Sequence, residues 1–237
     1  MDVICVSTSE PTQWYYHWTE YLESLRRLGV TPTNIGEGKP WDGLMTKALI
    51  LRDWLRSQGD LTGRRMIFTD AWDVLYVEHP DAIDARCERL YGDAVVFSGE
   101  RVCWPDPSQT ELFPPTSSPW RWMNGGMYAG PCSQVLAMLE SSSIEAFGLG
   151  DANDQVYFID LYLKQPVPIV VDQACEVFQS AVYTELDEFD LDDLPFRNRA
   201  TGTKPGILHF PGNGKNTLMP YLLDRWGYMP FEKAMGR

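Results

Sequence analysis

The sequence contains no long hydrophobic run. Its hydrophobic fraction is an ordinary 44%, but no apolar stretch approaches the roughly 20 residues that a helix needs to cross a bilayer. The first six residues, Met1-Asp2-Val3-Ile4-Cys5-Val6, also lack the basic start and the sustained apolar segment of a secretory signal. The sequence therefore predicts no membrane segment, and we expect a cytoplasmic location.

Paired cysteines and an excess of basic residues are missing as well. The five cysteines, at positions 5, 87, 103, 132 and 175, are odd in number and include no C-x-x-C pair for zinc or redox chemistry, which favours reduced thiols with a structural role. The chain has 20 Lys and Arg residues against 33 Asp and Glu residues, a formal net charge of −13. Because nucleic-acid backbones are bound through Lys and Arg, this argues against a broad nucleic-acid-binding surface. A narrow basic groove, at Arg64-Arg65 or at Arg197 and Arg199, stays open.

Strand-like runs alternate with helical patterns along the chain. In the first part, strands are expected at 3–7 and 33–35 and from 66, and helices at 18–28 and 44–58. Further on, strands are expected at 94–97, 169–172, 175–179 and 206–208, and helices at 81–91, at 131–142 and from 153. The initial β-α-β-α-β order is typical of a parallel sheet with right-handed crossovers. We therefore predict an α/β fold with a mostly parallel central sheet flanked by helices, in a single domain over residues 1–237.

The most informative stretch is Met66-Ile67-Phe68-Thr69-Asp70-Ala71-Trp72-Asp73-Val74. Here an apolar strand ends in two carboxylates in a D-x-x-D pattern. Ligands of open α/β sheets bind beyond the carboxyl ends of the strands, so Asp70 and Asp73 are expected to face a cleft. Their hard oxygen atoms suit Mg²⁺ or Mn²⁺ carrying a phosphorylated substrate. Alone, the pattern also fits a solvated turn or a helix cap, since Asp is common in both.

Other candidate residues follow later strands. Glu100 and Trp104 come after the strand at 94–97, near the same edge of the sheet. The pair Gly125-Gly126 indicates either a close approach of the backbone to a bulky group or a tight turn. Asp154 stands at the start of a helix, where it interacts either with the helix dipole or with a donor sugar. These positions widen the candidate site beyond the two aspartates.

The last candidate segment lies near the C-terminus. His209 follows a strand-like run and precedes the turn Gly212-Asn213-Gly214-Lys215. Histidine is a common metal ligand, and a glycine-rich turn with a lysine can hold a diphosphate through its backbone N–H groups and one positive charge. Together with this segment, Asp70 and Asp73 become a predicted metal and nucleotide site.

Several ordered motifs resemble the glycosyltransferase domain of the collagen lysyl hydroxylase family, which has a glycosyltransferase A-type fold. The chain is also similar, more distantly, to glycogenin-like transferases. The resemblance covers most of the chain. The matching stretches are Val3-Ile4-Cys5-Val6-Ser7-Thr8, Thr69-Asp70-Ala71-Trp72-Asp73-Val74, Phe97-Ser98-Gly99-Glu100, Cys103-Trp104-Pro105, Asn124-Gly125-Gly126, Asp154-Gln155, Phe178-Gln179, and His209 with Gly212-Asn213-Gly214-Lys215.

The resemblance implies a UDP-sugar bound through Mn²⁺ or Mg²⁺, with Asp70, Asp73 and His209 as the metal ligands. It places Trp72 against uracil, where the family usually has a tyrosine. The residues implied to face the sugar and the acceptor as catalytic groups are Glu100, Trp104 and Asp154. The other residues assigned to the nucleotide sugar are Val6, Thr8, Lys47, Asn124, Gly125, Gly212, Asn213, Gly214 and Lys215. Residues 1–100 are then a nucleotide-binding half, and 101–237 an acceptor-side half that includes the metal-diphosphate loop.

The chain departs from the family at four points. The run of acids before Asp-Gln is shortened to Ala152-Asn153-Asp154, which leaves fewer candidates for a base. A small residue between Asn and Gly-Gly is missing, and Phe210-Pro211 lengthen the turn after the histidine. No counterpart of the family's hydroxylase domain is present, so we expect that this chain does not hydroxylate its own acceptor.

The leading hypothesis is a glycosyltransferase that moves glucose or galactose from a UDP-sugar to a hydroxyl acceptor, such as hydroxylysine in a collagen-like polypeptide. A divalent ion, Lys215 and the amides of 212–214 would stabilise the departing diphosphate. If the product inverts, Asp154 or Glu100 acts as the base. One alternative is transfer to a glycan or to hydroxymethylated bases in DNA, and another is a module that binds a nucleotide sugar or glycan without activity. A nucleotidyltransferase is disfavoured, because residues 7–12 lack the glycine-rich loop that it needs.

Overall fold

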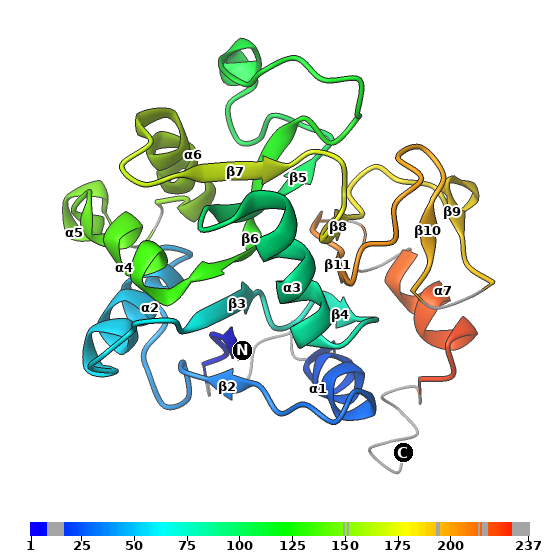
Figure 1. The fold of residues 1–237 in the computed structure, drawn as a ribbon, viewed down its shortest axis with the longest axis horizontal. Helices are drawn as coiled ribbons and strands as arrows, with labels where there is room; N and C mark the ends of the chain where they lie inside the picture. The colour runs from blue at the N-terminus through cyan, green and yellow to red at the C-terminus, as the bar shows by residue number, and fades with distance from the viewer. Residues whose placement is uncertain are drawn as a thin grey trace.

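The structure, a computed structural model, describes residues 1–8, 17–148, 150, 152–192, 195–212, 214 and 218–228. Its central sheet has six strands in the order β2-β1-β3-β6-β5-β7 (Figure 1). The strands are β1 (Asp2–Cys5), β2 (Thr33–Asn34), β3 (Arg65–Thr69), β5 (Val95–Glu100), β6 (Trp122–Pro131) and β7 (Ile169–Asp172). Only β6 is antiparallel to its neighbours, β3 and β5, and the other pairs are parallel. The predicted mostly parallel α/β sheet is confirmed.

Helices cover both faces of this sheet because its strands are apolar on both sides. Along β3, Met66 and Phe68 belong to one core cluster and Ile67 belongs to another, as expected for side chains that alternate between faces. The first cluster packs against α2 (Thr46–Ser57), α4 (Cys132–Glu140) and α6 (Asp154–Lys164). The second packs against α1 (Trp18–Arg27) and α3 (Pro80–Tyr91). A short helix, α5 (Ile144–Phe147), follows α4.

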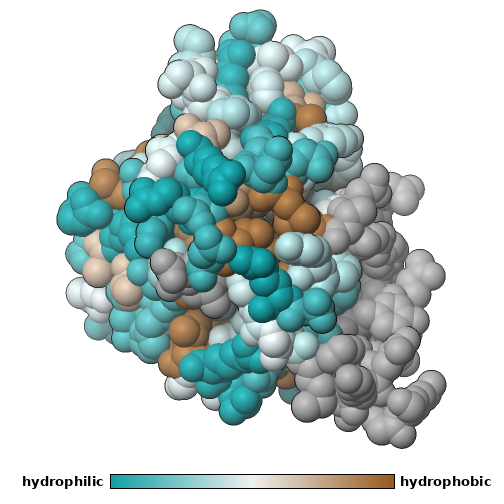
Figure 2. All heavy atoms as spheres, turned by 90° about the vertical axis from the view of Figure 1, so that its right-hand side faces the viewer, coloured by the Kyte–Doolittle hydropathy of each residue, from teal (hydrophilic) through white to brown (hydrophobic). Residues whose placement is uncertain are grey.

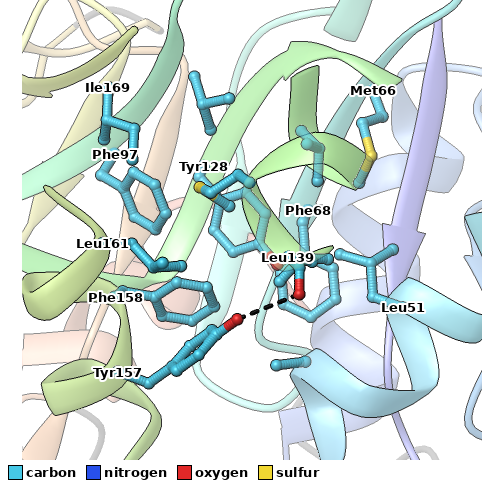
Figure 3. Close-up of a cluster of buried hydrophobic side chains, with 14 of the residues drawn as sticks. Leu51, Met66, Phe68, Phe97, Tyr128, Leu139, Tyr157, Phe158, Leu161 and Ile169 are labelled. Carbon is cyan, nitrogen blue, oxygen red and sulfur yellow. Dashed lines mark hydrogen bonds between the residues drawn. The ribbon is translucent and has the colours of Figure 1, made fainter. Parts of the chain in front are cut away.

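Aromatic rings fill the core on the α6 side of the sheet, as Figure 3 shows. The ring of Phe97 stacks on that of Tyr128 with centroids 4.7 Å apart, and Phe158 of α6 lies 5.1 Å from Phe97. Buried Tyr157 keeps its hydroxyl satisfied by donating to the carbonyl of Leu139, 3.2 Å away. This packing fixes α6 against the sheet, and with it the residues at the start of α6.

A second, smaller sheet was not predicted. It has the order β4-β11-β8, from β4 (Val74–Tyr76), β11 (Ile207–His209) and β8 (Phe178–Ser180). The prediction placed β8 too early, at 175, because the apolar run hides a turn: Cys175 has φ +52°, and Asp172 accepts the backbone N–H groups of 176–178. His209 likewise lies within its strand and not after it.

The C-terminal part packs on the second sheet. A third core cluster joins this sheet to α7 (Leu218–Arg225) and to the hairpin of β9 (Phe189–Asp190) and β10 (Arg197–Asn198). Two 3-10 helices, η2 (Pro107–Leu112) and η3 (Leu186–Glu188), lie in the connecting segments. The face drawn in Figure 2 is largely hydrophilic, with hydrophobic residues gathered near its centre. None of the helices in the described ranges is long and apolar enough to cross a membrane.

Candidate active site

A pocket of about 600 Å³ lies where the two sheets meet. Strand ends and helix starts of both halves of the chain contribute to it: Asp70 follows β3, Asp73 precedes β4, Glu100 ends β5, and Asp154 begins α6. The residues that line the pocket are Leu44, Lys47, Asp70, Asp73, Glu100, Val102, Trp104, Asn124, Gly126, Asp154, Gln155, Val182, Tyr183, His209, Pro211, Gly212 and Gly214.

Two carboxylates and an imidazole converge at one point of this pocket. One ligand atom from each of Asp70, Asp73 and His209 lies within 4.8 Å of the other two. Nε2 of His209 is 3.4 Å from Oδ1 of Asp73 and 3.8 Å from Oδ2 of Asp70. Burial of the imidazole opposes its charged form, but the two carboxylates outweigh burial and raise the pKa of His209 above its ordinary value. The arrangement therefore attracts a positive charge to the space between the three side chains.

Asn124 fixes which nitrogen of His209 faces the carboxylates. Its Oδ1 accepts the backbone N–H of Gly126 at 2.9 Å, which sets the orientation of the amide. The same oxygen lies 3.0 Å from Nδ1 of His209, so Nδ1 must carry the hydrogen and donate. In the neutral ring, Nε2 then has a free lone pair directed toward Asp70 and Asp73. This is how metal-ligating histidines are usually held in proteins.

The backbone of β6 leaves room for this group only because residue 126 is glycine. A Cβ atom on Gly126 would lie 2.4 Å from Cε1 of His209 and 2.8 Å from Oδ2 of Asp70. The glycine pair is thus a site of close approach inside a ten-residue strand, and the tight-turn alternative is wrong. Gly125 serves packing on the other face, where a Cβ would lie 3.0 Å from the ring of Phe158. Donor set, imidazole orientation and available space all fit a divalent ion such as Mn²⁺ or Mg²⁺.

Lys47 joins two of the acidic residues. Its ammonium lies 2.7 Å from Oδ1 of Asp70 and 2.8 Å from Oδ2 of Asp154, and its side chain is only 11% exposed. Burial works against the charge, but the two carboxylates raise the pKa of Lys47 above its usual value. Asp154 is placed by the start of α6, where Asn153 caps the helix by accepting the N–H of Gln155 at 2.9 Å. Lysine and aspartate thus extend the site from the metal-ligand group toward α6.

Glu100 is buried beside these groups and is held by two amides. Nε2 of Gln155 donates to one carboxylate oxygen at 2.6 Å, and Nδ2 of Asn124 donates to the other at 3.0 Å. Burial raises the pKa of Glu100 to about 7, against the effect of these two hydrogen bonds. Asn124 therefore contacts both His209 and Glu100, and it links the metal-ligand group to a carboxyl that can gain or lose a proton near neutral pH.

The other predicted residues divide into three groups. Trp104 lines the pocket and is 49% exposed, and Gly212 and Gly214 line it as well. Val6, Thr8, Trp72 and Gly125 are among the described residues that do not line it. Asn213 and Lys215 lie outside the described residues.

Trp72 and the end of β1 meet beside the pocket. The indole N–H of Trp72 donates to Oγ of Ser7 at 3.1 Å, and Ser7 precedes the buried Thr8. The residues that the resemblance assigns to the nucleoside are therefore neighbours, at the edge of the sheet next to β3.

The sequence analysis missed several residues that line the pocket, and two of them, Gln155 and Tyr183, bear on its chemistry. Gln155 was matched only as part of a motif, yet its amide donates to Glu100 and to the carbonyl of Trp104. Its place in the first turn of α6, beside Asp154, was the signal available. Tyr183 lies in a segment after β8 for which no pattern predicted a structure, and nothing in the sequence marks it.

The central sheet with its antiparallel β6, and the acidic pocket at the ends of its strands, define a glycosyltransferase domain of the GT-A fold. A solved glycosyltransferase involved in glycosylation of the major capsid of PBCV-1 has this fold, with a TM-score of 0.51, 11% identity, and coverage of 94% of this chain and 98% of that one. The model of the family described as PLOD GT domain matches residues 1–230, and the chain belongs to this family.

Relatives of this chain are longer proteins. A multifunctional procollagen lysine hydroxylase and glycosyltransferase of Caenorhabditis elegans is 28% identical over 225 residues, which cover 86% of this chain and 30% of that protein. An uncharacterized protein of Acanthamoeba polyphaga mimivirus is 27% identical over 191 residues, covering 78% of this chain and 40% of that protein. The chain thus spans about a third of the length of the relatives that it matches.

Proposed function

We propose that the chain is a Mn²⁺-dependent glycosyltransferase that moves a hexose from a UDP-sugar to a hydroxyl acceptor. The observation that carries this proposal is the convergence of Asp70, Asp73 and His209, with the imidazole oriented by Asn124, in a pocket of the family's glycosyltransferase fold. A divalent ion held by the three side chains would neutralise the charge that develops on the departing diphosphate.

The residues of the chain can assist the departure of UDP directly. Lys47 places a positive charge beside Asp70. Gly212 lines the same pocket in a turn, which the hydrogen bond of 3.2 Å from the N–H of Gly214 to the carbonyl of Pro211 closes. As the bond between the anomeric carbon and the diphosphate oxygen breaks, the electron pair leaves with UDP, and these groups stabilise the negative charge. We place the uracil against Trp72, since Trp72 contacts Ser7, the residue before Thr8, just after β1.

Glu100 is the better of the two candidate bases. Its pKa of about 7 is near the value at which a general base works best at neutral pH. Asp154 is already engaged by Lys47 at 2.8 Å. In an inverting reaction Glu100 would take the proton of the acceptor hydroxyl as the new bond to the anomeric carbon forms. We place the acceptor at Trp104, which is exposed at the pocket and adjoins Glu100 through Gln155.

The proposed acceptor is hydroxylysine in a collagen-like polypeptide. Support comes from the family and from the names of relatives, which include procollagen lysine hydroxylases. The pocket itself is acidic: Asp70, Asp73, Glu100 and Asp154 line it, against Lys47 and His209. An acceptor whose hydroxyl stands beside an ammonium group suits such a pocket better than the phosphate backbone of DNA does.

Calorimetry of UDP binding tests the metal site. We expect the wild type to bind UDP only with Mn²⁺ present, and Asp70→Asn and Asp73→Asn to abolish this binding, because each removes a charged ligand. Asp224→Asn removes an exposed carboxylate on α7 and serves as the matched control. Unchanged UDP affinity in both site variants would reject the metal assignment.

A mass-spectrometric screen then tests the reaction. UDP-glucose and UDP-galactose are each incubated with Mn²⁺ and hydroxylysine peptides, glycans or hydroxymethylated DNA. We expect a gain of one hexose on the peptide. Release of UDP without any acceptor would establish a working donor site independently. If no UDP is released with any acceptor, a binding module is favoured.

A further inference from the structure

Tyr183 is the most exposed large hydrophobic side chain of the described residues, at 72%, although it lines the pocket. Most aromatic residues in the described ranges either belong to the three core clusters or pack against them. Trp104, the other aromatic residue of the pocket, is also exposed. The pocket therefore presents two aromatic rings to solvent beside its acidic interior.

The backbone holds Tyr183 in a conformation that a bulky residue rarely adopts. Its φ is +51°, in the left-handed region that favours glycine and asparagine. Such a conformation persists only where the surroundings enforce it, and residues of this kind gather at ligand sites. Here the enforcing contact is a hydrogen bond of 2.8 Å from Nη1 of Arg101 to the carbonyl of Tyr183.

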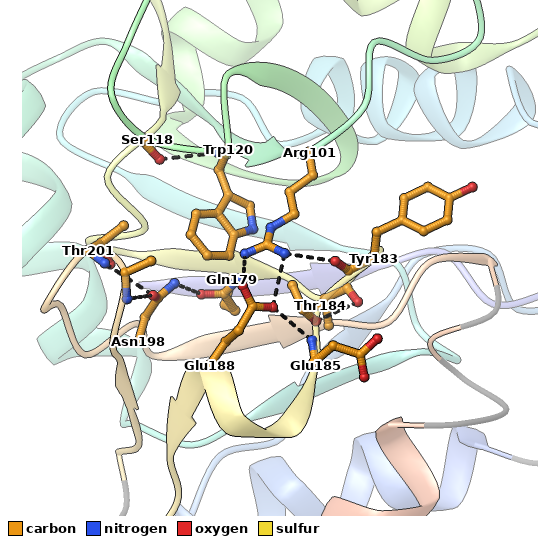
Figure 4. A network of polar contacts seen from close by, with 12 residues as sticks. Arg101, Ser118, Trp120, Gln179, Tyr183, Thr184, Glu185, Glu188, Asn198 and Thr201 are labelled. Atoms are coloured by element: carbon orange, nitrogen blue, oxygen red, sulfur yellow. Dashed lines mark hydrogen bonds and ion pairs between the residues drawn. The ribbon is translucent and has the colours of Figure 1, made fainter.

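Arg101 is itself held on three sides, as Figure 4 shows. Its guanidinium pairs with both carboxylate oxygens of Glu188, and it lies over the ring of buried Trp120 at 4.4 Å. Trp120 is fixed in turn by donating its indole N–H to the carbonyl of Ser180 at 2.9 Å. Figure 4 shows the ring of Tyr183 pointing away from this network. The network thus positions the backbone and leaves the ring available to a ligand.

The strand order separates Tyr183 from the nucleoside end. Arg101 directly follows Glu100, at the end of β5, whereas Ser7 and Thr8 follow β1. Two strands, β3 and β6, lie between β1 and β5, a separation of about 14 Å at ordinary strand spacing. Tyr183 is also close to the metal-ligand group, because the N–H of Ala181 donates to the carbonyl of His209 at 2.8 Å.

We propose that Tyr183 binds the acceptor, and that its ring contacts the ammonium-bearing side chain on which the hexose is placed. The inference rests on the proposed function and adds to it a residue and a basis for acceptor choice. An aromatic face attracts a cation. A hydroxylated side chain that also carries an ammonium group is therefore preferred over a neutral hydroxyl acceptor.

Steady-state transfer from UDP-galactose and UDP-glucose to a hydroxylysine peptide tests the inference. We expect Tyr183→Ala to raise the KM for the peptide about tenfold with a smaller change in kcat, and Tyr183→Phe to keep the KM within about twofold, since the ring is retained. Tyr221→Ala, which removes an exposed tyrosine of α7 outside the pocket, is the matched control and should leave both constants unchanged.

A second peptide separates the effect of the ammonium charge from that of the hydroxyl group. Acetylation of the hydroxylysine ε-amine removes the cation and keeps the hydroxyl. We expect the wild type to use this peptide poorly and Tyr183→Ala to lose little further with it. An equal effect of the alanine change on both peptides would overturn the cation contact, and no effect on either KM would overturn the inference altogether.

Donor chemistry separates this inference from the proposed function. UDP release by the wild type without acceptor reports the donor site alone, and failure to release UDP both without acceptor and with every acceptor would reject the proposed function. Release of UDP by a wild type that does not glycosylate the hydroxylysine peptide would overturn the inference about Tyr183 and the hydroxylysine acceptor, and the UDP-sugar donor site would still stand. Loss of Mn²⁺-dependent UDP binding in Tyr183→Ala would also overturn the inference, since the residue would then belong to the donor.

Discussion

Replacing Glu100 by glutamine tests the balance that sets the charge of this buried side chain. In the folded chain, burial raises the pKa of Glu100 from 4.5 to about 7, although Asn124 and Gln155 donate to its carboxylate. Between these two pH values the folded chain holds a proton that the unfolded chain has lost. The free energy of unfolding therefore falls as the pH rises through this window.

The magnitude follows from the size of the shift. One pKa unit corresponds to about 1.4 kcal/mol, so the whole effect is on the order of 3 kcal/mol, and about 2 to 3 kcal/mol of it develops between pH 5 and 8. Glu100→Gln carries no charge at any pH. The NH₂ group of the new side chain faces the NH₂ donor of Asn124 or Gln155, so one hydrogen bond is lost. This loss costs about 1 kcal/mol, and the cost does not change with pH. Relative to the variant, the wild type is expected to lose about 2 to 3 kcal/mol from pH 5 to 8.

Urea denaturation followed by tryptophan fluorescence, in buffers that contain EDTA, measures this difference. Glu37→Gln removes an exposed carboxyl and provides the reference for a change of charge at the surface. A difference between wild type and Glu100→Gln that stays constant within about 0.5 kcal/mol across this range would refute the reasoning. So would a change in the opposite direction, which would mean that the two amides outweigh burial.

Two further variants test the groups around the metal ligands. Gly126→Ala places a methyl group 2.4 Å from Cε1 of His209. We expect calorimetry to show a loss of Mn²⁺ affinity of at least about tenfold, with an unchanged circular dichroism spectrum. An affinity equal to that of the wild type would contradict the close approach. Lys47→Met leaves the carboxylates of Asp70 and Asp154 without their shared cation. We expect it to lower the free energy of unfolding at pH 7 by about 3 kcal/mol, and a loss below about 1 kcal/mol in urea denaturation would contradict a strong contribution from this pair.

The sequence predicted the central sheet and the position of Asp70 because both depend on local pattern. An apolar run of strand length that ends in a carboxylate places that carboxylate at the sheet edge, where β3 ends. Strands were expected near β8 and β11, but β4 was not. The second sheet escaped prediction because β4 and β8 have three residues each and pair with a strand far along the chain. Runs so short carry no period that distinguishes a strand from a turn.

The sequence predicted many residues of the candidate site, but it did not predict the hydrogen bonds between them. The motif match brought Glu100, Asn124 and Asp154 into the site, but the match does not say which atoms they share. The amide of Asn124 accepts from Gly126 and donates to Glu100, and that dual role depends on a bulge between β5 and β6 that sequence does not reveal. The backbone conformation of Tyr183 depends on a hydrogen bond from Arg101, which lies in a different segment of the chain, so no local pattern in the sequence predicts it.

The three candidate metal ligands come from two sheets, so a bound ion would be a structural cross-link. Asp70 and Asp73 belong to the loop between β3 and β4, and His209 lies on β11 of the smaller sheet. An ion shared by the three would tie the C-terminal third of the fold to the central sheet, with an energy that grows with the concentration of free metal. If such an ion is bound, its depletion would make the C-terminal third more accessible to proteases, and protection of that region from cleavage would follow the concentration of free divalent metal.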